Sequence, residues 1–286
     1  MPRGPVKWAL AGLALAIAIL LASCSVQPPA KQIAPTAQRP PVHRDKPRPV
    51  ASAPAEKQEP KVTTAEIPSP KPAQPTARHR RRYGGYPGEI VHSSDTNKVA
   101  LTFDAGASGA PTPSILKTLR LAGLHVTFFL TGKFCEQNPE LVKQIAADGH
   151  EIGNHTYSHA DLRKLGDDAI VEQLQKADDL IINLTGKSAT PLLRPPFGGR
   201  DKRVLAIAGE QGYRSVYWSL DSFDAYKKGI TSQKIEDRIL ERLQGGDIVL
   251  MHCGSAATAA QLGDLISKLQ QRGYQIVKVS DLMNGG

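Results

Sequence analysis

Beyond residue 92 the chain alternates between short runs of apolar residues and longer stretches with helical periodicity. The apolar runs predict seven strands, at residues 99–103, 125–130, 151–153, 192–193, 215–218, 248–251 and 275–279. The stretches between them predict helices near 112–122, 139–148, 167–184, 202–211, 232–244 and 258–272. Strands that alternate with helices are typical of a parallel sheet with right-handed crossovers.

An open doubly wound sheet and a closed barrel both satisfy this pattern. The open sheet lacks support, because no Gly-rich dinucleotide fingerprint follows a strand. The nearest match, Phe-Gly-Gly-Arg at 197–200, follows a proline pair and lacks the spacing. Nearly every predicted strand instead ends in a polar candidate, which favours a barrel whose strand ends share one mouth.

Composition divides the chain near residue 92. Residues 25–92 hold 14 of the 22 prolines and almost no apolar periodicity, which predicts a disordered tether. Residues 1–92 carry 14 Lys and Arg against 5 Asp and Glu, whereas residues 93–286 carry 22 of each. Because the globular part has no net charge, we expect no nucleic acid substrate. The basic cluster at 78–82 is expected to contact anionic lipid or cell-wall polymer, or to be a solvated linker.

The N-terminus predicts an export signal. Arg3 and Lys7 precede an apolar run at 8–22, about 15 residues long, which suits a signal-peptide core and is short for a spanning helix. The run ends in Leu-Ala-Ser-Cys24, which resembles the bacterial lipobox and implies a lipidated Cys24 at the mature N-terminus. An uncleaved anchor helix or an ordinary signal peptide is the alternative.

Polar residues follow the predicted strands in five stretches. Residues 99–106, Val-Ala-Leu-Thr-Phe-Asp-Ala-Gly, predict a buried strand that ends in the carboxylate of Asp104 and a glycine turn. The other four are Asn-His-Thr-Tyr-Ser-His at 154–159, Arg-Pro-Pro-Phe-Gly at 194–198, Trp-Ser-Leu-Asp-Ser-Phe-Asp at 218–224 and Leu-Met-His at 250–252. In this order and spacing they closely resemble the five motifs of the polysaccharide deacetylase family, carbohydrate esterase family 4. The resemblance implies a distorted (β/α)7 barrel over about residues 95–282.

Two histidines suggest a metal site. His155 and His159 stand four residues apart, a spacing that places two imidazoles on one face of a helix or tight turn. The resemblance implies that both bind a divalent metal, usually zinc. The family's first motif supplies a second aspartate as third ligand, where this chain has Ala105. The two histidines could then hold a weaker metal completed by water, Asp104 or another group could fill the gap, or the reaction could proceed without metal.

Amide hydrolysis needs a base, stabilisation of the oxyanion and an acid for the leaving amine. The resemblance implies that Asp104 is the general base and that Arg194 beside it keeps the carboxylate ionised. It also implies that His252 is the general acid. A carboxylate partner would raise the pKa of this histidine and fix its tautomer, with Asp224 the best candidate and Asp221 the second.

The remaining motif residues are expected to bind substrate. By resemblance, the backbone N–H near Phe197 helps to bind the oxyanion, on a loop that Pro195 and Pro196 stiffen. Trp218 and Leu250 are expected to line the pocket for the acetyl methyl group, with plain core packing as the alternative.

Two cysteines remain in the folded region, Cys135 and Cys253. In an exported protein these two cysteines could form a disulfide, and two buried free thiols are the alternative.

The sequence thus predicts a hydrolase that removes N-acetyl groups from amino sugars of a cell-envelope polysaccharide. Peptidoglycan is the first choice of substrate, followed by chitin-like oligomers, poly-N-acetylglucosamine and acetylated xylan. The predicted divisions are a lipoprotein signal peptide at 1–23, a Pro-rich basic linker at 24–92 and a catalytic domain at 93–286. We expect a bacterial enzyme lipid-anchored to a membrane and facing the periplasm or wall. The alternatives are a carbohydrate-binding lipoprotein that has lost turnover, which Ala105 supports, and a structural tether between membrane and wall.

Overall fold

The sheet at the centre of the fold is entirely parallel. The computed structural model describes residues 85–106, 108–225 and 229–283. Within them the strands are β1 Lys98–Ala105, β2 Thr127–Leu130, β3 Glu151–Asn154, β4 Leu192–Leu193, β5 Arg214–Ser215, β6 Leu220–Asp221, β7 Ile248–His252 and β8 Gln275–Val277. Their order is β5-β4-β3-β2-β1-β7-β6, and β8 pairs with the first residues of β1.

The connectivity forces this sheet to curl. In a flat sheet the outer strands of a seven-strand path would lie about 29 Å apart, at about 4.8 Å per step. The two ends of the path are β5 and β6, and the chain from Ser215 to Leu220 spans at most about 18 Å. The two edges must therefore approach each other, which gives the distorted barrel that the sequence predicts.

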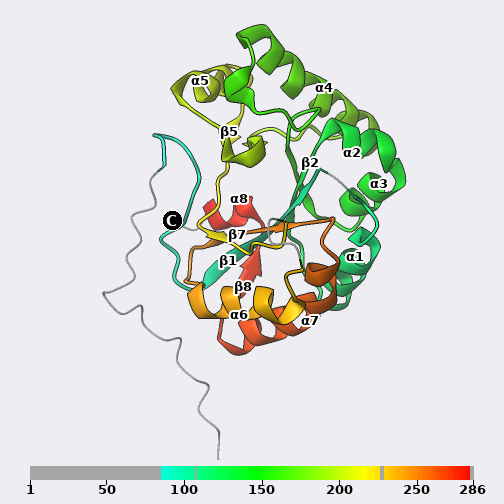
Figure 1. Cartoon of the computed structure of the whole chain (residues 1–286), viewed down its shortest axis with the longest axis vertical. Helices are drawn as coiled ribbons and strands as arrows, with labels where there is room; N and C mark the ends of the chain where they lie inside the picture. Colours follow the sequence, from blue (N-terminus) through cyan, green and yellow to red (C-terminus); the bar gives the residue numbers. More distant parts are fainter. Residues whose placement is uncertain (1–84, 107, 226–228, 284–286) are drawn as a thin grey trace, which may run out of the picture. The chain divides into compact units, whose positions relative to one another are not determined.

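Helices cover the outside of the curled sheet (Figure 1). They are α1 Thr112–Leu121, α2 Gly132–Gln137, α3 Pro139–Ala147, α4 Asp167–Thr185, α5 Lys202–Glu210, α6 Ser232–Arg242 and α7 Ala256–Gln271. The last helix, α8 Val279–Met283, packs instead against the inner face of the sheet. Contacts run from α6 to α7, α1, α3, α4 and α5 in turn, following the order of the strands beneath. Figure 1 shows α1 to α4 along one side and α6 beside α7 along another.

Capping residues explain where several helices begin and end. The side chains of Asp201, Thr231 and Ser255 each accept a hydrogen bond from the backbone N–H three residues later, at the starts of α5, α6 and α7. Gly186 ends α4 in the left-handed conformation, with φ of 74°, which a side chain would strain. The six helices predicted from periodicity begin and end within two residues of the observed bounds.

Alternation along β1 separates two apolar layers. Val99, Leu101 and Phe103 face outward and pack with the helices in the main core. Ala100 faces the interior, where α8 and the segment before β1 complete a second cluster. Its buried members are Ile90, Ala100, Phe129, Leu192, Val216, Ile248, Val279 and Leu282. The lower part of the barrel interior is thus largely apolar, apart from Thr127 and Glu151, whose side chains are hydrogen-bonded to each other where β2 and β3 begin.

The structure confirms the predicted fold class and alters some of its details. Of the predicted strand at 215–218 only Ser215 lies in a strand, β5, while β6 at 220–221 was not predicted. The last strand stops at Val277 because α8 begins at Val279. The short helix α2 was not predicted. Residues 85–92, which the prediction assigned to the linker, lie against the barrel, since Ile90 forms a parallel bridge with Val216.

The predicted signal peptide and the linker up to residue 84 lie outside the described residues. Among the helices of the described residues, none is long and apolar enough to cross a membrane. The division of the chain into signal peptide, linker and catalytic domain remains a prediction.

His150 gives a testable link between packing and acid stability. Its side chain is buried before β3, accepts a hydrogen bond from the backbone N–H of Val126 at 3.3 Å and packs on Phe128. Burial lowers the pKa of His150 from 6.5 to about 4. The unfolded chain therefore binds a proton that the folded chain does not, and the free energy of unfolding falls as pH drops from 6.5 toward 4.

We predict that His150→Asn, which retains an acceptor for Val126, weakens this pH dependence by up to about 1.4 kcal/mol per pH unit, the effect of one proton. Urea unfolding at a series of pH values measures it. His125→Asn changes an exposed histidine close by and serves as the control. An unchanged slope in the His150 variant would contradict the prediction.

Candidate active site

The ends of four neighbouring strands carry the polar residues of the site. Asp104 at the end of β1 is aligned with His252 on β7, so the two side chains lie side by side on the inner face. On the other side of β1, Asp104 is aligned with Phe129 of β2. Directly after β3, His155 continues the pairing by donating its backbone N–H to the carbonyl of Leu130.

Arg194 follows β4 and is fully buried inside the barrel. Its Nη1 donates to Asp104 Oδ1 at 2.7 Å and to the Thr102 hydroxyl at 2.8 Å. The guanidinium also donates to the carbonyls of Val216 and Tyr217 and lies 4.1 Å from the ring centroid of Phe129. A buried guanidinium needs this number of partners, because an uncompensated buried charge is strongly destabilising.

The charge of Asp104 depends on these neighbours. Burial by itself would raise its pKa, but the positive charge of Arg194, with contributions from His155 and His252, holds the pKa below its usual value. Arg194 binds Oδ1, while Oδ2 faces His155. The structure therefore presents an ionised carboxylate at the mouth.

The two predicted metal ligands lie together beside Asp104. The ring centroids of His155 and His159 are 4.9 Å apart. His155 Nδ1 lies 2.6 Å from the carbonyl oxygen of Arg194, an acceptor, so Nδ1 carries the proton and Nε2 does not. Burial lowers the pKa of His155 to about 4, which keeps the ring neutral.

This tautomer leaves two acceptors facing each other. Nε2 of His155 and Oδ2 of Asp104 are 3.5 Å apart. Two ligand atoms on a tetrahedral zinc ion lie about 3.3 Å apart, given bonds of about 2.0–2.1 Å. A cation would satisfy both acceptors, so His155 Nε2 and Asp104 Oδ2 are spaced to fit a divalent ion, with the His159 ring close by.

A third side-chain ligand is not evident. Ala105 is buried in the outer core with Phe103, on the opposite side of β1 from Asp104. Among the described residues no group of three or more His, Cys, Asp and Glu side chains is arranged to hold a metal. The donor set is therefore two imidazoles with one nearby carboxylate oxygen.

His252 is held by the predicted carboxylate. Asp224 Oδ1 lies 2.7 Å from His252 Nδ1, and its Oδ2 accepts the backbone N–H of His252 at 2.9 Å. The Thr258 hydroxyl donates to the same Oδ2 at 2.6 Å. Burial alone would lower the pKa of His252, but the hydrogen bond and charge of Asp224, with Asp104 and Asp221, raise it above its usual value.

The loop after β4 presents Phe197 to the mouth. Its side chain is 60% exposed, and its ring centroid lies 4.6 Å from that of His159. Phe197 has φ of 58°, an unfavourable backbone conformation for a residue with a side chain. Thr156, His159 and Phe223 share positive φ values, and all four residues belong to motif stretches. Strained backbone thus gathers around the site, as it does at many functional sites.

The two remaining predicted residues lie on other walls of the barrel. Trp218 stands between β5 and β6, with its ring centroid 5.9 Å from the Arg194 guanidinium. Leu250 is aligned with Thr102, one inward position below His252, and is almost fully buried. The structure therefore brings Trp218 near the buried pair and places Leu250 beneath the mouth.

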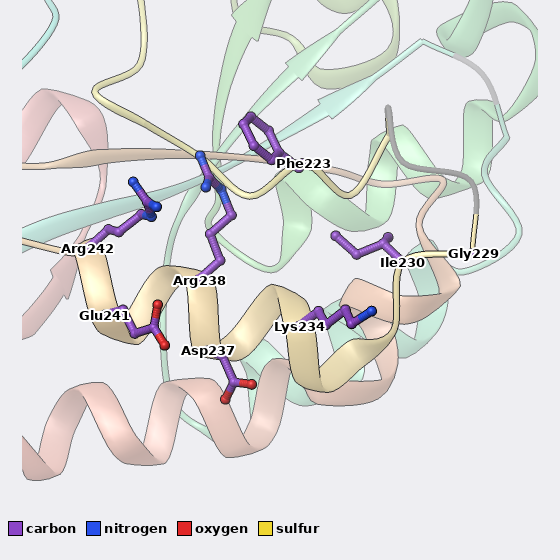
Figure 2. Close-up of a pocket in the computed structure, with 8 residues that line it drawn as sticks. All are labelled: Phe223, Gly229, Ile230, Lys234, Asp237, Arg238, Glu241 and Arg242. Carbon is purple, nitrogen blue, oxygen red and sulfur yellow. The ribbon is translucent and has the colours of Figure 1, made fainter.

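Helix α6 supports the segment that carries Asp224. Arg238 donates to the carbonyl of Asp221 at 2.6 Å, and its guanidinium lies 3.5 Å from the ring centroid of Phe223. Figure 2 shows this stack at the edge of a surface pocket of about 350 Å³. Its lining residues are Phe223, Gly229, Ile230, Lys234, Asp237, Arg238, Glu241 and Arg242. None of the predicted site residues lines it.

Cys135 and Cys253 are separate buried thiols, so the disulfide that the sequence allowed is not formed. Burial raises the pKa of Cys135 to about 12 and also raises that of Cys253. Both thiols are therefore inert core residues.

Sequence analysis missed two hydroxyl groups that hold the charged residues. Thr102 accepts from Arg194 and donates to the carbonyl of Val249, while Thr258 donates to Asp224. Thr102 was detectable, since it lies two residues before Asp104 and therefore on the same face of a strand. Thr258 gave no such signal, because it lies on a helix outside all five motif stretches.

Comparison with known proteins assigns the chain to a family. Residues 92–216 match the family model described as polysaccharide deacetylase. The peptidoglycan-N-acetylmuramic acid deacetylase PdaA of Bacillus subtilis is 34% identical over 199 residues, covering 69% of this chain and 76% of that protein. Its solved structure superposes with a TM-score of 0.66, at 31% identity over 69% of this chain and 85% of that one.

Two further relatives differ in what their names state. The peptidoglycan-N-acetylglucosamine deacetylase PgdA of Listeria monocytogenes is 35% identical over 68% of this chain, which spans 40% of that longer protein. A family pseudoenzyme from Bacillus anthracis superposes with a TM-score of 0.66, at 28% identity over 70% of each chain.

The fold and the site define the class of a polysaccharide N-deacetylase. The chain belongs to the polysaccharide deacetylase family, carbohydrate esterase family 4, as the five motif stretches predicted.

The paired His252 and Asp224 give a prediction that does not depend on turnover. Asp224→Asn removes the charge and weakens the hydrogen bond that favour protonated His252, so the pKa of His252 should fall. NMR titration of the histidine Cε1–H resonances measures it. Asp221→Asn is the matched control, because Asp221 contributes charge without a hydrogen bond and should have the smaller effect. An equal or larger fall in the control would show that Asp224 is not the main partner.

Proposed function

We propose that this protein removes N-acetyl groups from the amino sugars of peptidoglycan. One observation carries the proposal: an ionised carboxylate and a histidine of raised pKa stand side by side on adjacent strands. Each has its own buried partner, Arg194 for Asp104 and Asp224 for His252. A base kept ionised and an acid kept protonated are the pair that amide hydrolysis needs.

In the proposed reaction Asp104 acts through Oδ2, because Arg194 occupies Oδ1. Oδ2 takes a proton from the attacking water, and the carbon–nitrogen bond of the acetamide then breaks. His252 delivers a proton to the leaving amine, since Asp224 fixes its ring through Nδ1. The backbone N–H of Phe197 stabilises the oxyanion, and Trp218 and Leu250 enclose the acetyl methyl group.

His155 and His159 would hold the divalent cation, with zinc as the first candidate. When bound, such an ion polarises the acetyl carbonyl and stabilises the negative charge that develops on its oxygen. His155 is ready for this role, because the Arg194 carbonyl holds its Nδ1–H and turns Nε2 toward the mouth.

The substrate proposal draws on the relatives, whose names state activity on N-acetylglucosamine or N-acetylmuramic acid of peptidoglycan. We further propose that the chain is anchored in the bacterial cell envelope through lipidated Cys24. Residues 25–84 could then reach up to about 190 Å if fully extended, at about 3.1 Å per residue. The barrel would contact wall polymer well away from the membrane.

Acetate release tests the activity. The full chain incubated with purified peptidoglycan should release acetate, and mass spectrometry of the digested wall should identify the sugar that loses its acetyl group. Asp104→Asn should lower the rate by about 10²- to 10⁴-fold, the usual contribution of a general base. Asp281→Asn, which changes a half-exposed carboxylate on α8, should leave the rate unchanged. Equal rates in the two variants would exclude Asp104 as the base.

Zinc affinity distinguishes the proposed base, Asp104, from the proposed ligands, His155 and His159. His155→Ala and His159→Ala should each weaken zinc binding at least about tenfold, since even supporting residues of metal sites have effects of that size. Asp104→Asn should weaken it less than either histidine variant while losing activity. Isothermal titration calorimetry of the folded variants measures the affinities. A loss of zinc in Asp104→Asn as large as in the histidine variants would make Asp104 a ligand.

A second candidate function is glycan binding without turnover. It is favoured by Ala105 in place of the usual aspartate and by the similarity to the Bacillus anthracis pseudoenzyme. Peptidoglycan that binds the chain but releases no acetate, with zinc or other divalent ions supplied, would favour this alternative.

A further inference from the structure

A buried ion pair joins the segment before the barrel to the loop after β4. Glu89 lies three residues before the region that matches the family model, and its side chain is fully buried. Arg200 binds it with two parallel hydrogen bonds, at 2.5 Å from Nε to Oε1 and 2.9 Å from Nη2 to Oε2. The Ser215 hydroxyl and the Tyr86 backbone N–H also donate to this carboxylate. Glu89 therefore fixes the position and the plane of the Arg200 guanidinium.

The guanidinium of Arg200 begins a stack that leads toward the active site. It lies 3.5 Å from the ring centroid of Tyr217. Tyr217 is stacked on Trp218, with centroids 4.0 Å apart and planes inclined by 17°. Trp218 in turn lies 5.9 Å from the guanidinium of Arg194, which binds Asp104. A continuous set of contacts thus runs from Glu89 to the buried pair at the mouth.

The same arginine holds the turn that presents Phe197. Arg200 Nη1 donates to the carbonyl of Gly198 at 3.2 Å. Gly198 has φ of 65°, and a Cβ there would lie 2.5 Å from Tyr217 and 3.0 Å from Trp218. The turn and the two rings fit without spare room. A shift of Arg200 would therefore move both the turn that presents Phe197 and the ring of Trp218.

We propose that Glu89 and Arg200 are positioning residues for the glycan cleft. They set the orientation of Trp218 and of the turn at Pro196–Gly198, so the segment preceding the family region forms part of the substrate-binding wall. This inference rests on the proposed function for its ligand, an N-acetylated glycan. The positions of the rings can be tested without any ligand.

Tryptophan fluorescence provides the test. The chain has two tryptophans, Trp8 and Trp218, so the full chain carrying Trp8→Phe reports on Trp218 alone. In this background, Glu89→Gln and Arg200→Gln should each increase acrylamide quenching of Trp218. They should also weaken binding of a soluble N-acetylglucosamine oligomer about tenfold, and raise KM for acetate release with kcat within about twofold, the pattern of lost binding.

A double variant distinguishes positioning from stability. Glu89→Gln with Arg200→Gln leaves no unpaired buried charge, so it should recover stability relative to the single variants. Glutamine is too short to stack on Tyr217 and reach Gly198, so quenching and affinity should stay altered. Glu236→Gln removes another buried carboxylate, which pairs with the half-exposed Lys268 between α6 and α7, and should leave Trp218 unchanged.

Wild-type quenching and affinity in the double variant would overturn the proposal, as would single variants in which Trp218 does not respond. Altered quenching together with no binding of the oligomer by the wild-type chain would instead refute the proposed function and retain the positioning role.

Discussion

The buried contact between Arg194 and Asp104 is the interaction on which the site depends. A guanidinium with no exposure to water is tolerated only because a carboxylate, a hydroxyl and two backbone carbonyls surround it. The carbonyls come from Val216 and Tyr217, between β5 and β6, where the sheet path returns on itself. The same side chain therefore joins the ends of β4 and β1 to the segment between the two sheet edges and keeps Asp104 ionised, which links the curl of the sheet to the site.

Strand alternation explains why the chemistry lies at one end. On β1 the inward positions are Ala100, Thr102 and Asp104, which become more polar toward the carboxyl end. The parallel register places each of them level with Ile248, Leu250 and His252 on β7. Each inward layer is therefore shared between strands far apart in the sequence. Phe129 and Leu192 fill the interior below the mouth, and Asp104, Arg194 and His252 meet above them at the carboxyl ends of the strands.

The departure from the family's first motif at Ala105 leaves the surroundings of Asp104 and His252 in place. Ala105 lies on the outer face of β1, and the bond between Asp104 and Arg194 does not involve it. His252 and Asp224 belong to the opposite edge of the site and do not depend on that position. In the proposed reaction, His252 and Asp224 would therefore serve proton transfer apart from the residues that would hold a metal. Ala105 in place of the family's aspartate would therefore affect metal affinity more than proton transfer.

The sequence by itself determined the alternation of strands and helices, the family and the nine candidate site residues, because periodicity, helix caps and motif spacing are local properties. It did not determine that a separate strand, β6, forms at 220–221, or that Ile90 packs inside the barrel, since both depend on partners far along the chain. The tautomer of His155, the support of Asp224 by Thr258 and the separation of the two thiols were likewise decided by tertiary contacts. A hydrogen bond or a buried charge belongs to a pair of residues, and which pairs meet is settled only when the sheet curls and brings its strand ends to one mouth.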